Sequence, residues 1–150
     1  MKDKELRIIS LLRQDARMQL TEMSKLTHMP VSTIYEALKA SRGNLIKKIT
    51  CIVDFKELCF NARANILLSV RHDQRDKLVE SLMNSANVNS LYRVNNGYDL
   101  LVEGVFRHVA ELEFFLDRLE ERFHIKDKQV FYIIEDIKRE AFMADSLVPV

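Results

Sequence analysis

Residues 20–41, LTEMSKLTHMPVSTIYEALKAS, read as two short helices joined by a tight turn. Pro30 suits the first turn of a helix and is poor inside one, so it separates the two segments. Apolar residues recur on one helical face in each segment: Leu20, Met23 and Leu26 in the first, and Val31, Ile34 and Leu38 in the second. This pattern predicts a helix-turn-helix, although an ordinary helical hairpin in a small bundle has the same spacing.

The flanking segments fit a winged form of this motif. Apolar spacing predicts a helix over residues 4–15, and residues 46–55, IKKITCIVDF, predict a strand. Lys47 and Lys48 either contact DNA phosphates as wing residues or lie in a solvated turn, and the sequence leaves both readings open. We predict a winged helix-turn-helix domain over residues 1–53 and a linker over residues 54–62.

A different order of elements follows the linker. Strands are predicted at 64–70, 88–94, 98–106 and 129–137, and helices at 73–83 and 109–123. The order β-α-β-β-α-β predicts a ferredoxin-like domain over residues 63–140, followed by a C-terminal tail over residues 141–150. The fold class is therefore α+β.

The predicted strands 98–106 and 129–137 carry apolar residues on both faces. Two helices can cover only one face of such a sheet, so the other face needs a partner. A second copy of the chain, stacked sheet on sheet, is the simplest candidate. We therefore expect a homodimer at least.

The composition, 47% hydrophobic and 30% charged, is that of a soluble globular protein. No apolar run approaches the ~18 residues that a membrane helix needs, and the first residues do not form a signal peptide. The sequence predicts a cytoplasmic protein that does not interact with membranes.

Few residues point to catalysis or metal binding. The two cysteines are eight residues apart, and the four histidines lie far from one another, without metal-ligand spacing. The chain has no P-loop, no GxGxxG and no nucleophile elbow. We expect no catalytic residue, no metal and no cofactor.

The net charge of +1 is unevenly distributed. Residues 1–60 hold 11 Lys and Arg against 7 Asp and Glu, whereas residues 61–150 hold 12 against 15. A basic first half suits double-stranded DNA as a partner. The excess is modest, so a single protomer should bind DNA weakly.

Several short segments, taken in order, resemble the Lrp/AsnC family of transcriptional regulators over nearly all of residues 1–140. They are Ala16-Arg17 at the end of the first helix, the helix-turn-helix, Asn44-Leu45-Ile46, the linker at 54–58, and the turn Asn96-Gly97-Tyr98-Asp99. The turn resembles the family's Gly-x-Tyr-Asp signature, with Asn96 in place of glycine. The resemblance implies dimers that bind palindromic DNA and often assemble into octamers.

The resemblance also implies a small effector, commonly an amino acid, near this turn. It selects Asn96, Gly97 and Asp99 as candidate effector-binding residues. From the residues alone, Gly97 also fits a plain hairpin turn and Asp99 a turn-capping carboxylate, whereas Tyr98 is expected in the core.

Steps of about 100° along the second helix of the motif place its polar residues opposite the buried face. The candidate DNA-binding residues there are Ser32, Thr33, Tyr35, Glu36 and Lys39, together with Lys47 and Lys48 of the wing. Glu36 fits a hydrogen bond from a cytosine amino group, but a solvated carboxylate or a pair with Lys39 is the reading that the sequence favours.

The sequence thus predicts a sequence-specific DNA-binding transcriptional regulator, dimeric or higher, and not an enzyme. Two other classes remain open: an architectural protein that wraps DNA with low sequence specificity, and a small dimeric ferredoxin-like enzyme. The attached helix-turn-helix argues against the enzyme.

Overall fold

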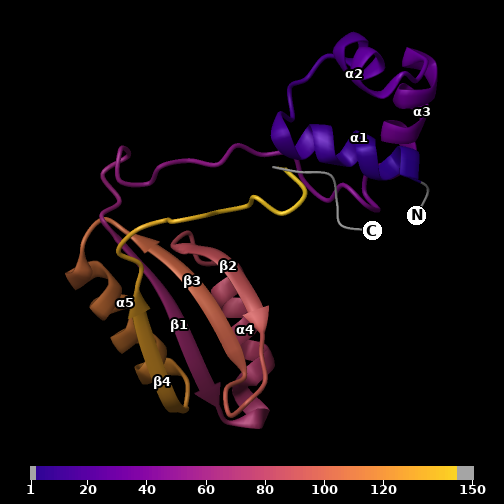
Figure 1. Ribbon diagram of the computed structural model, residues 1–150. Coiled ribbons are helices and arrows are strands. Elements are labelled where there is room, and N and C mark those ends of the chain that lie inside the picture. Colours follow the sequence, from indigo (N-terminus) through magenta and orange to yellow (C-terminus); the bar gives the residue numbers. More distant parts are fainter. Residues whose placement is uncertain (1–2, 145–150) are drawn as a thin grey trace. The chain divides into compact units, whose positions relative to one another are not determined.

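The computed structural model describes residues 3–144, which form two units (Figure 1). The first contains the described residues up to Ile52 and those from Ile137 onward, and the second is Val53–Asp136. Three helices followed by an antiparallel sheet with two helices confirm the α+β class. Among residues 3–144 there is no helix with the length and apolar character to cross a membrane.

The first unit packs three helices around a small core. They are α1 (Asp3–Gln14), α2 (Leu20–Thr27) and α3 (Val31–Ser41). The buried residues come from all three helices and from the turn between α2 and α3: Ile8, Met23, Met29 and Ile34. Each helix contributes its apolar stripe to one shared centre, as the spacing predicted.

Two residues of the predicted stripes do not enter this core. Leu26 is 56% exposed, and Val31 is 39% exposed. Thr27, four residues after Met23, lies closer than Leu26 to the direction of Met23, because four residues turn a helix by only about 40° beyond a full turn. Thr27 is buried in its place, and its hydroxyl donates to the Met23 carbonyl at 2.6 Å.

The strand predicted over residues 46–55 is wrong. This segment contains no strand and forms only an isolated bridge between Arg42 and Ile46. Its apolar side chains find little cover, with Ile49 and Ile52 more than half exposed. A strand needs a neighbour to accept and donate its backbone hydrogen bonds, and the described chain places none beside this segment.

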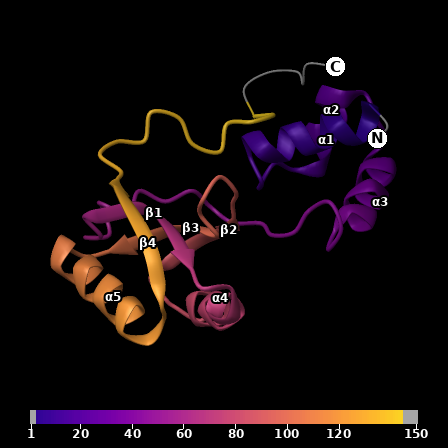
Figure 2. The ribbon, with the colours of Figure 1, turned by 90° about the horizontal axis from the view of Figure 1, so that it is seen from below.

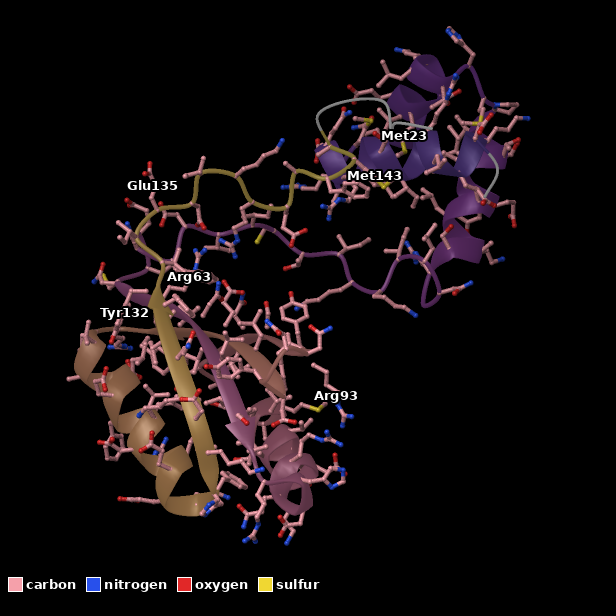
Figure 3. All side chains as sticks on the ribbon, turned by 60° about the horizontal axis from the view of Figure 1, so that its bottom comes forward. Met23, Arg63, Arg93, Tyr132, Glu135 and Met143 are labelled. Carbon is pink, nitrogen blue, oxygen red and sulfur yellow. The ribbon has the colours of Figure 1, made fainter. Side chains whose placement is uncertain are left out.

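The segment that follows the sheet joins the first unit by hydrogen bonds to α1. The Arg13 guanidinium donates to the Glu140 carboxylate and to the carbonyls of Glu140 and Phe142, at 2.8–3.2 Å. The Ser10 hydroxyl donates to the Met143 carbonyl at 2.7 Å. Figure 3 shows Met143 beside the helices that enclose Met23. Residues 137–140, assigned from sequence to the second domain, therefore cluster with the first; the predicted tail beyond residue 144 lies outside the described residues.

The second unit is a four-stranded antiparallel sheet in the order β2-β3-β1-β4. Its strands are β1 (Ala62–Val70), β2 (Val88–Arg93), β3 (Leu100–Phe106) and β4 (Ile125–Tyr132). Two helices, α4 (Arg75–Met83) and α5 (Val109–Arg122), lie on one side of it (Figure 2). A short 3-10 turn, η1 (His72–Gln74), precedes α4.

The last strand lies earlier in the chain than predicted. β4 pairs with β1 from Val70 opposite Ile125 to Ala64 opposite Tyr132, whereas the sequence indicated residues 129–137. The predicted strand lies too far toward the C-terminus because it was centred on the apolar run at residues 130–134. An edge strand is bounded by the pairing that its neighbour offers, and Lys126 and Asp127 can sit in it with exposed side chains.

The core of this unit fills the space between the sheet and the two helices. It alternates along β1, where every second residue from Ala62 to Val70 is buried. Leu78, Leu82, Leu112, Phe115, Leu116 and Leu119 come from the helices. Met83, the last residue of α4, and Val109, the first residue of α5, are 74% and 51% exposed.

Gly104 has a packing role that the sequence did not signal. A Cβ atom at this position would lie 2.5 Å from Cε2 of Phe106, the next residue on the same face of β3. The Phe106 ring is fully buried and sits 5.3 Å, between centroids, from the ring of Phe115. The absence of a side chain at Gly104 therefore lets the ring lie flat on the strand.

Gly104→Ala should lower the free energy of unfolding by about 1–3 kcal/mol, because the added methyl group displaces a ring with no room to move. Urea denaturation measures the change. In Gly104→Ala combined with Phe106→Leu, the loss should be smaller than the sum of the two single losses, since leucine has no ring to displace. Strict additivity would contradict this packing.

Candidate DNA interface and effector region

One side of α3 is free of intramolecular packing. The candidate residues Ser32, Thr33, Tyr35, Glu36 and Lys39 are all exposed. Ile34, on the opposite side, is completely buried. The structure thus brings the five predicted side chains together on one accessible helical surface, next to a helix end that offers free backbone N–H groups.

The turn between α2 and α3 is held by a few local contacts. His28 ends α2 in the left-handed region, with φ 56° and ψ 31°. The Ser24 hydroxyl reaches across the turn and donates to the Met29 carbonyl at 2.6 Å. Pro30, at φ −57°, directly precedes α3. These contacts fix where the first turn of α3 begins, and with it the direction of Ser32 and Thr33.

Glu36 and Lys39 make no hydrogen bond or ion pair with each other or with any other residue between 3 and 144. The intramolecular pair that the sequence allowed is therefore absent from the described residues. Both charged groups face solvent and are available to a ligand. A carboxylate on this surface repels phosphate but accepts hydrogen bonds from base amino groups.

The two lysines of the expected wing differ in their surroundings. The Lys47 ammonium donates to the Gly43 carbonyl at 3.1 Å, in the loop that follows α3. Gly43 has φ +76°, a conformation that glycine adopts without strain. Lys48 is exposed. Both lysines lie close in sequence to the end of α3, but on an irregular segment and not on a strand.

The turn between β2 and β3 has the left-handed backbone that its sequence predicts. Asn96 has φ 66° and Gly97 has φ 90°. Asp99 fastens the turn to the central strand: its N–H donates to the Leu68 carbonyl, and its carboxylate accepts from the Val70 N–H, both at 2.9 Å. Asp99 therefore anchors the candidate effector region to the end of β1.

Tyr98 was expected in the core, and this expectation is wrong. The residue is half-buried, and its hydroxyl donates to the Asp127 carboxylate at 2.7 Å. The hydrogen bond to Asp127 raises the pKa of the Tyr98 phenol, because it stabilises the protonated form. Tyr98 thus ties the turn to the start of β4.

Arg75, at the start of α4, was not identified from the sequence. Its Nη1 lies 3.6 Å from Asp99 Oδ1. Its Nε is buried and donates no hydrogen bond within the described chain. Nothing local in the sequence signals this role, because the contact joins residues that are distant along the chain. The turn is thereby flanked by a partly exposed guanidinium.

Across residues 3–144, no three His, Cys, Asp or Glu side chains are grouped so that they could hold a metal ion. Cys51 and Cys59 are both free and exposed. The two candidate sites are the α3 surface and the β2–β3 turn.

Comparison with known families matches residues 63–142 to the Lrp/AsnC ligand binding domain. This match spans more than half of the chain and contains the β2–β3 turn. The chain belongs to the Lrp/AsnC family. The resemblance stated from the sequence is therefore confirmed.

The relatives of this Lrp/AsnC protein are transcriptional regulators. The HTH-type transcriptional regulator FL11 of Pyrococcus furiosus is 32% identical over 116 residues, which cover 77% of each chain. Its counterpart in Pyrococcus abyssi is 32% identical over 112 residues, or 74% of each chain. These findings confirm a DNA-binding transcriptional regulator and not an enzyme.

Solved structures share the fold along almost the full length. A transcriptional regulator of Neisseria meningitidis, NMB0573, crystallised as a complex with L-Met, has a TM-score of 0.84 at 18% identity and covers 93% of each chain. AsnC of E. coli has a TM-score of 0.80 at 14% identity, covering 93% of this chain and 95% of its own.

Proposed function

We propose that the chain is a dimeric, site-specific regulator that reads DNA with α3 and responds to a small effector, an amino acid, at the β2–β3 turn. The observation that carries the DNA part is the exposed polar surface of α3, opposite a fully buried Ile34. A second helix of a helix-turn-helix enters the major groove with such a surface.

The residues of this surface divide into two roles. Ser32 and Thr33, in the first turn of α3, have hydroxyls that suit base edges or nearby phosphates. Lys39, further along, suits the phosphate backbone. Glu36, without an intramolecular partner in the described chain, suits a cytosine amino group, and Tyr35 borders the surface. Lys47 and Lys48 extend the cationic contacts beyond α3.

Lys39→Ala should weaken binding to all sequences and reduce the slope of log K against log salt by about 0.9, the loss of one phosphate contact. Ser32→Ala should instead change which sequences are preferred. Selection of bound genomic fragments, followed by salt titration, measures both. Lys126→Ala, which removes the same charge from an exposed site on β4, is the control.

Two results of this selection would contradict the proposal. If Lys39→Ala leaves affinity and salt slope unchanged, α3 does not lie on the backbone as proposed. If the wild-type protein protects any DNA equally well, without enriched sequences, it is an architectural DNA-wrapping protein and not a site-specific regulator.

The open face of the sheet supports dimerisation. Leu67 of β1 lies directly opposite Leu101 of β3, and Leu101 lies opposite Tyr92 of β2, so an apolar row crosses three strands. Tyr92 and Phe131 on this face are more than half exposed. No element of the described chain covers the row. A second copy would bury it sheet against sheet, with a two-fold axis.

The charged side chains at one end of this face have partners within the same protomer. Glu103 Oε2 accepts hydrogen bonds from Asn89 at 2.7 Å and from Ser90 at 2.8 Å. Glu103 Oε1 also lies 3.3 Å from Nε of Arg63, whose guanidinium pairs in addition with Asp136. Charges already paired within one protomer can approach a second copy at lower desolvation cost than free charges.

Leu101→Glu should convert the protein to a monomer of 17.6 kDa, because it places an unpaired carboxylate in the centre of the row. Sedimentation velocity at micromolar concentration measures the mass. Met83→Glu, at an exposed position on α4, is the matched control and should stay dimeric. A wild-type chain that sediments as a monomer would contradict the dimer.

The effector proposal rests on the β2–β3 turn and its neighbours. Asn96 and Gly97 present backbone and amide groups, and the partly exposed Arg75 guanidinium lies nearby, beside Asp99. A carboxylate is the natural ligand of a guanidinium. The turn belongs to the segment that matches the family's ligand binding domain, and the N. meningitidis structure is a complex with L-Met. An amino acid therefore fits this site.

Asn96→Gly should abolish or weaken the response to the effector while preserving the turn, because glycine adopts φ > 0 freely. A panel of amino acids, screened by thermal shift and by DNA affinity, identifies the wild-type response. Asn95→Ala, one residue away, should keep it. An unchanged response in Asn96→Gly would remove Asn96 from the site.

A further inference from the structure

A cavity of about 330 Å³ lies within the first unit, between the start of α1 and the α2–α3 turn. Lys4 and Arg7 line it from α1, His28 from the turn, and Thr33 from the first turn of α3. Two segments that are separate in the sequence, residues 3–7 and 27–33, thus form one concave surface. Thr33 belongs both to this cavity and to the exposed surface of α3.

The chemistry of the cavity favours an anion. Lys4 and Arg7 are exposed, and neither makes an ion pair or a hydrogen bond with another residue between 3 and 144. One carboxylate, Asp3, lines the same cavity, so cations outnumber anions there by two to one. The Thr33 hydroxyl and the His28 imidazole add further hydrogen-bonding groups.

The size and lining argue for a compact ligand. The volume is at the small end of the range of about 300–1,000 Å³ that ligand pockets occupy. Lys4, Arg7 and Thr33 place charged and hydrogen-bonding groups around the cavity, beside the apolar side chains of Met29 and Pro30. A phosphate group, with several acceptor oxygens and a negative charge, satisfies Lys4, Arg7 and Thr33 together.

We propose that this cavity holds one phosphate of the DNA backbone, bound by Lys4 and Arg7. The inference rests on the proposed function, because it places the phosphate on the same DNA whose groove α3 enters. Thr33 makes the cavity continuous with the α3 surface, so both can meet one duplex. The phosphate contact then fixes the position of α3 on the duplex without reading bases.

Because both cations serve one phosphate, their loss is not additive. Lys4→Ala and Arg7→Ala should each weaken binding to selected and unselected DNA alike. The double variant should reduce the slope of log K against log salt by about 0.9, the value for one phosphate, and not by about 1.8. Fluorescence anisotropy over a salt series measures the slopes, and thermal melting shows that both side chains are dispensable for folding.

Lys126→Ala removes one positive charge from the other unit and should leave affinity and slope unchanged. The inference is overturned if the Lys4 and Arg7 variants bind with wild-type affinity and slope while Lys39→Ala does not; DNA reading by α3 then stands without this contact. A wild-type protein that fails to bind any selected DNA overturns the proposed function itself, together with the inference.

A free anion is the other source of the same chemistry. Inorganic phosphate, added to DNA-free protein at constant ionic strength, should cause no saturable shift of the Thr33 and His28 amide resonances, because two exposed cations hold a free anion only weakly. Saturable shifts that disappear in Arg7→Ala would assign the cavity to a free anion and overturn the assignment to the DNA backbone.

Discussion

The structure of the second unit depends on β1, a strand with two neighbours and two apolar faces. It pairs with β3 on one side and β4 on the other, and its residues alternate strictly between buried and half-buried. The helices α4 and α5 cover one face. On the other face, Leu67 and Leu101 form an apolar row that the described chain does not cover. The open apolar face therefore supports the proposed dimer, in which a second copy would cover it.

Periodicity was enough to predict the order of elements, because a helical stripe or a strand alternation is a local property of the sequence. Periodicity gave wrong predictions where pairing with a neighbouring strand decides whether a strand forms and where it begins and ends. Residues 46–55 have a β-rich sequence but no strand to pair with in the described chain. β4 begins four residues before the predicted strand, since its pairing with β1 and not its own apolar run sets its limits.

Local periodicity was also enough to place the candidate DNA-binding residues on one surface. The exposed surface of α3 follows from about 100° per residue, so Ser32 and Lys39 could be placed without coordinates. Contacts between distant segments could not. Arg75 meets Asp99 only because the β2–β3 turn folds back on the end of β1, and Arg7 and Thr33 line one cavity only because α1 starts beside the α2–α3 turn. In both cases the sequence shows a common exposed cation, and tertiary structure alone gives it a neighbour.

Under the proposed function, the modest positive charge of residues 1–60 makes dimerisation through the open sheet face important for DNA affinity. One protomer offers few phosphate contacts, and pairing two through their sheets doubles the contacts on one duplex. Asp99 lies where an effector could act on this pairing. Asp99 makes hydrogen bonds with the backbone of Leu68 and Val70. Ser69, between these two residues, lies on the face that a partner would cover. Under the proposed function, a ligand that displaces the turn would act on the end of β1 through these two hydrogen bonds, and so on the face proposed for dimerisation.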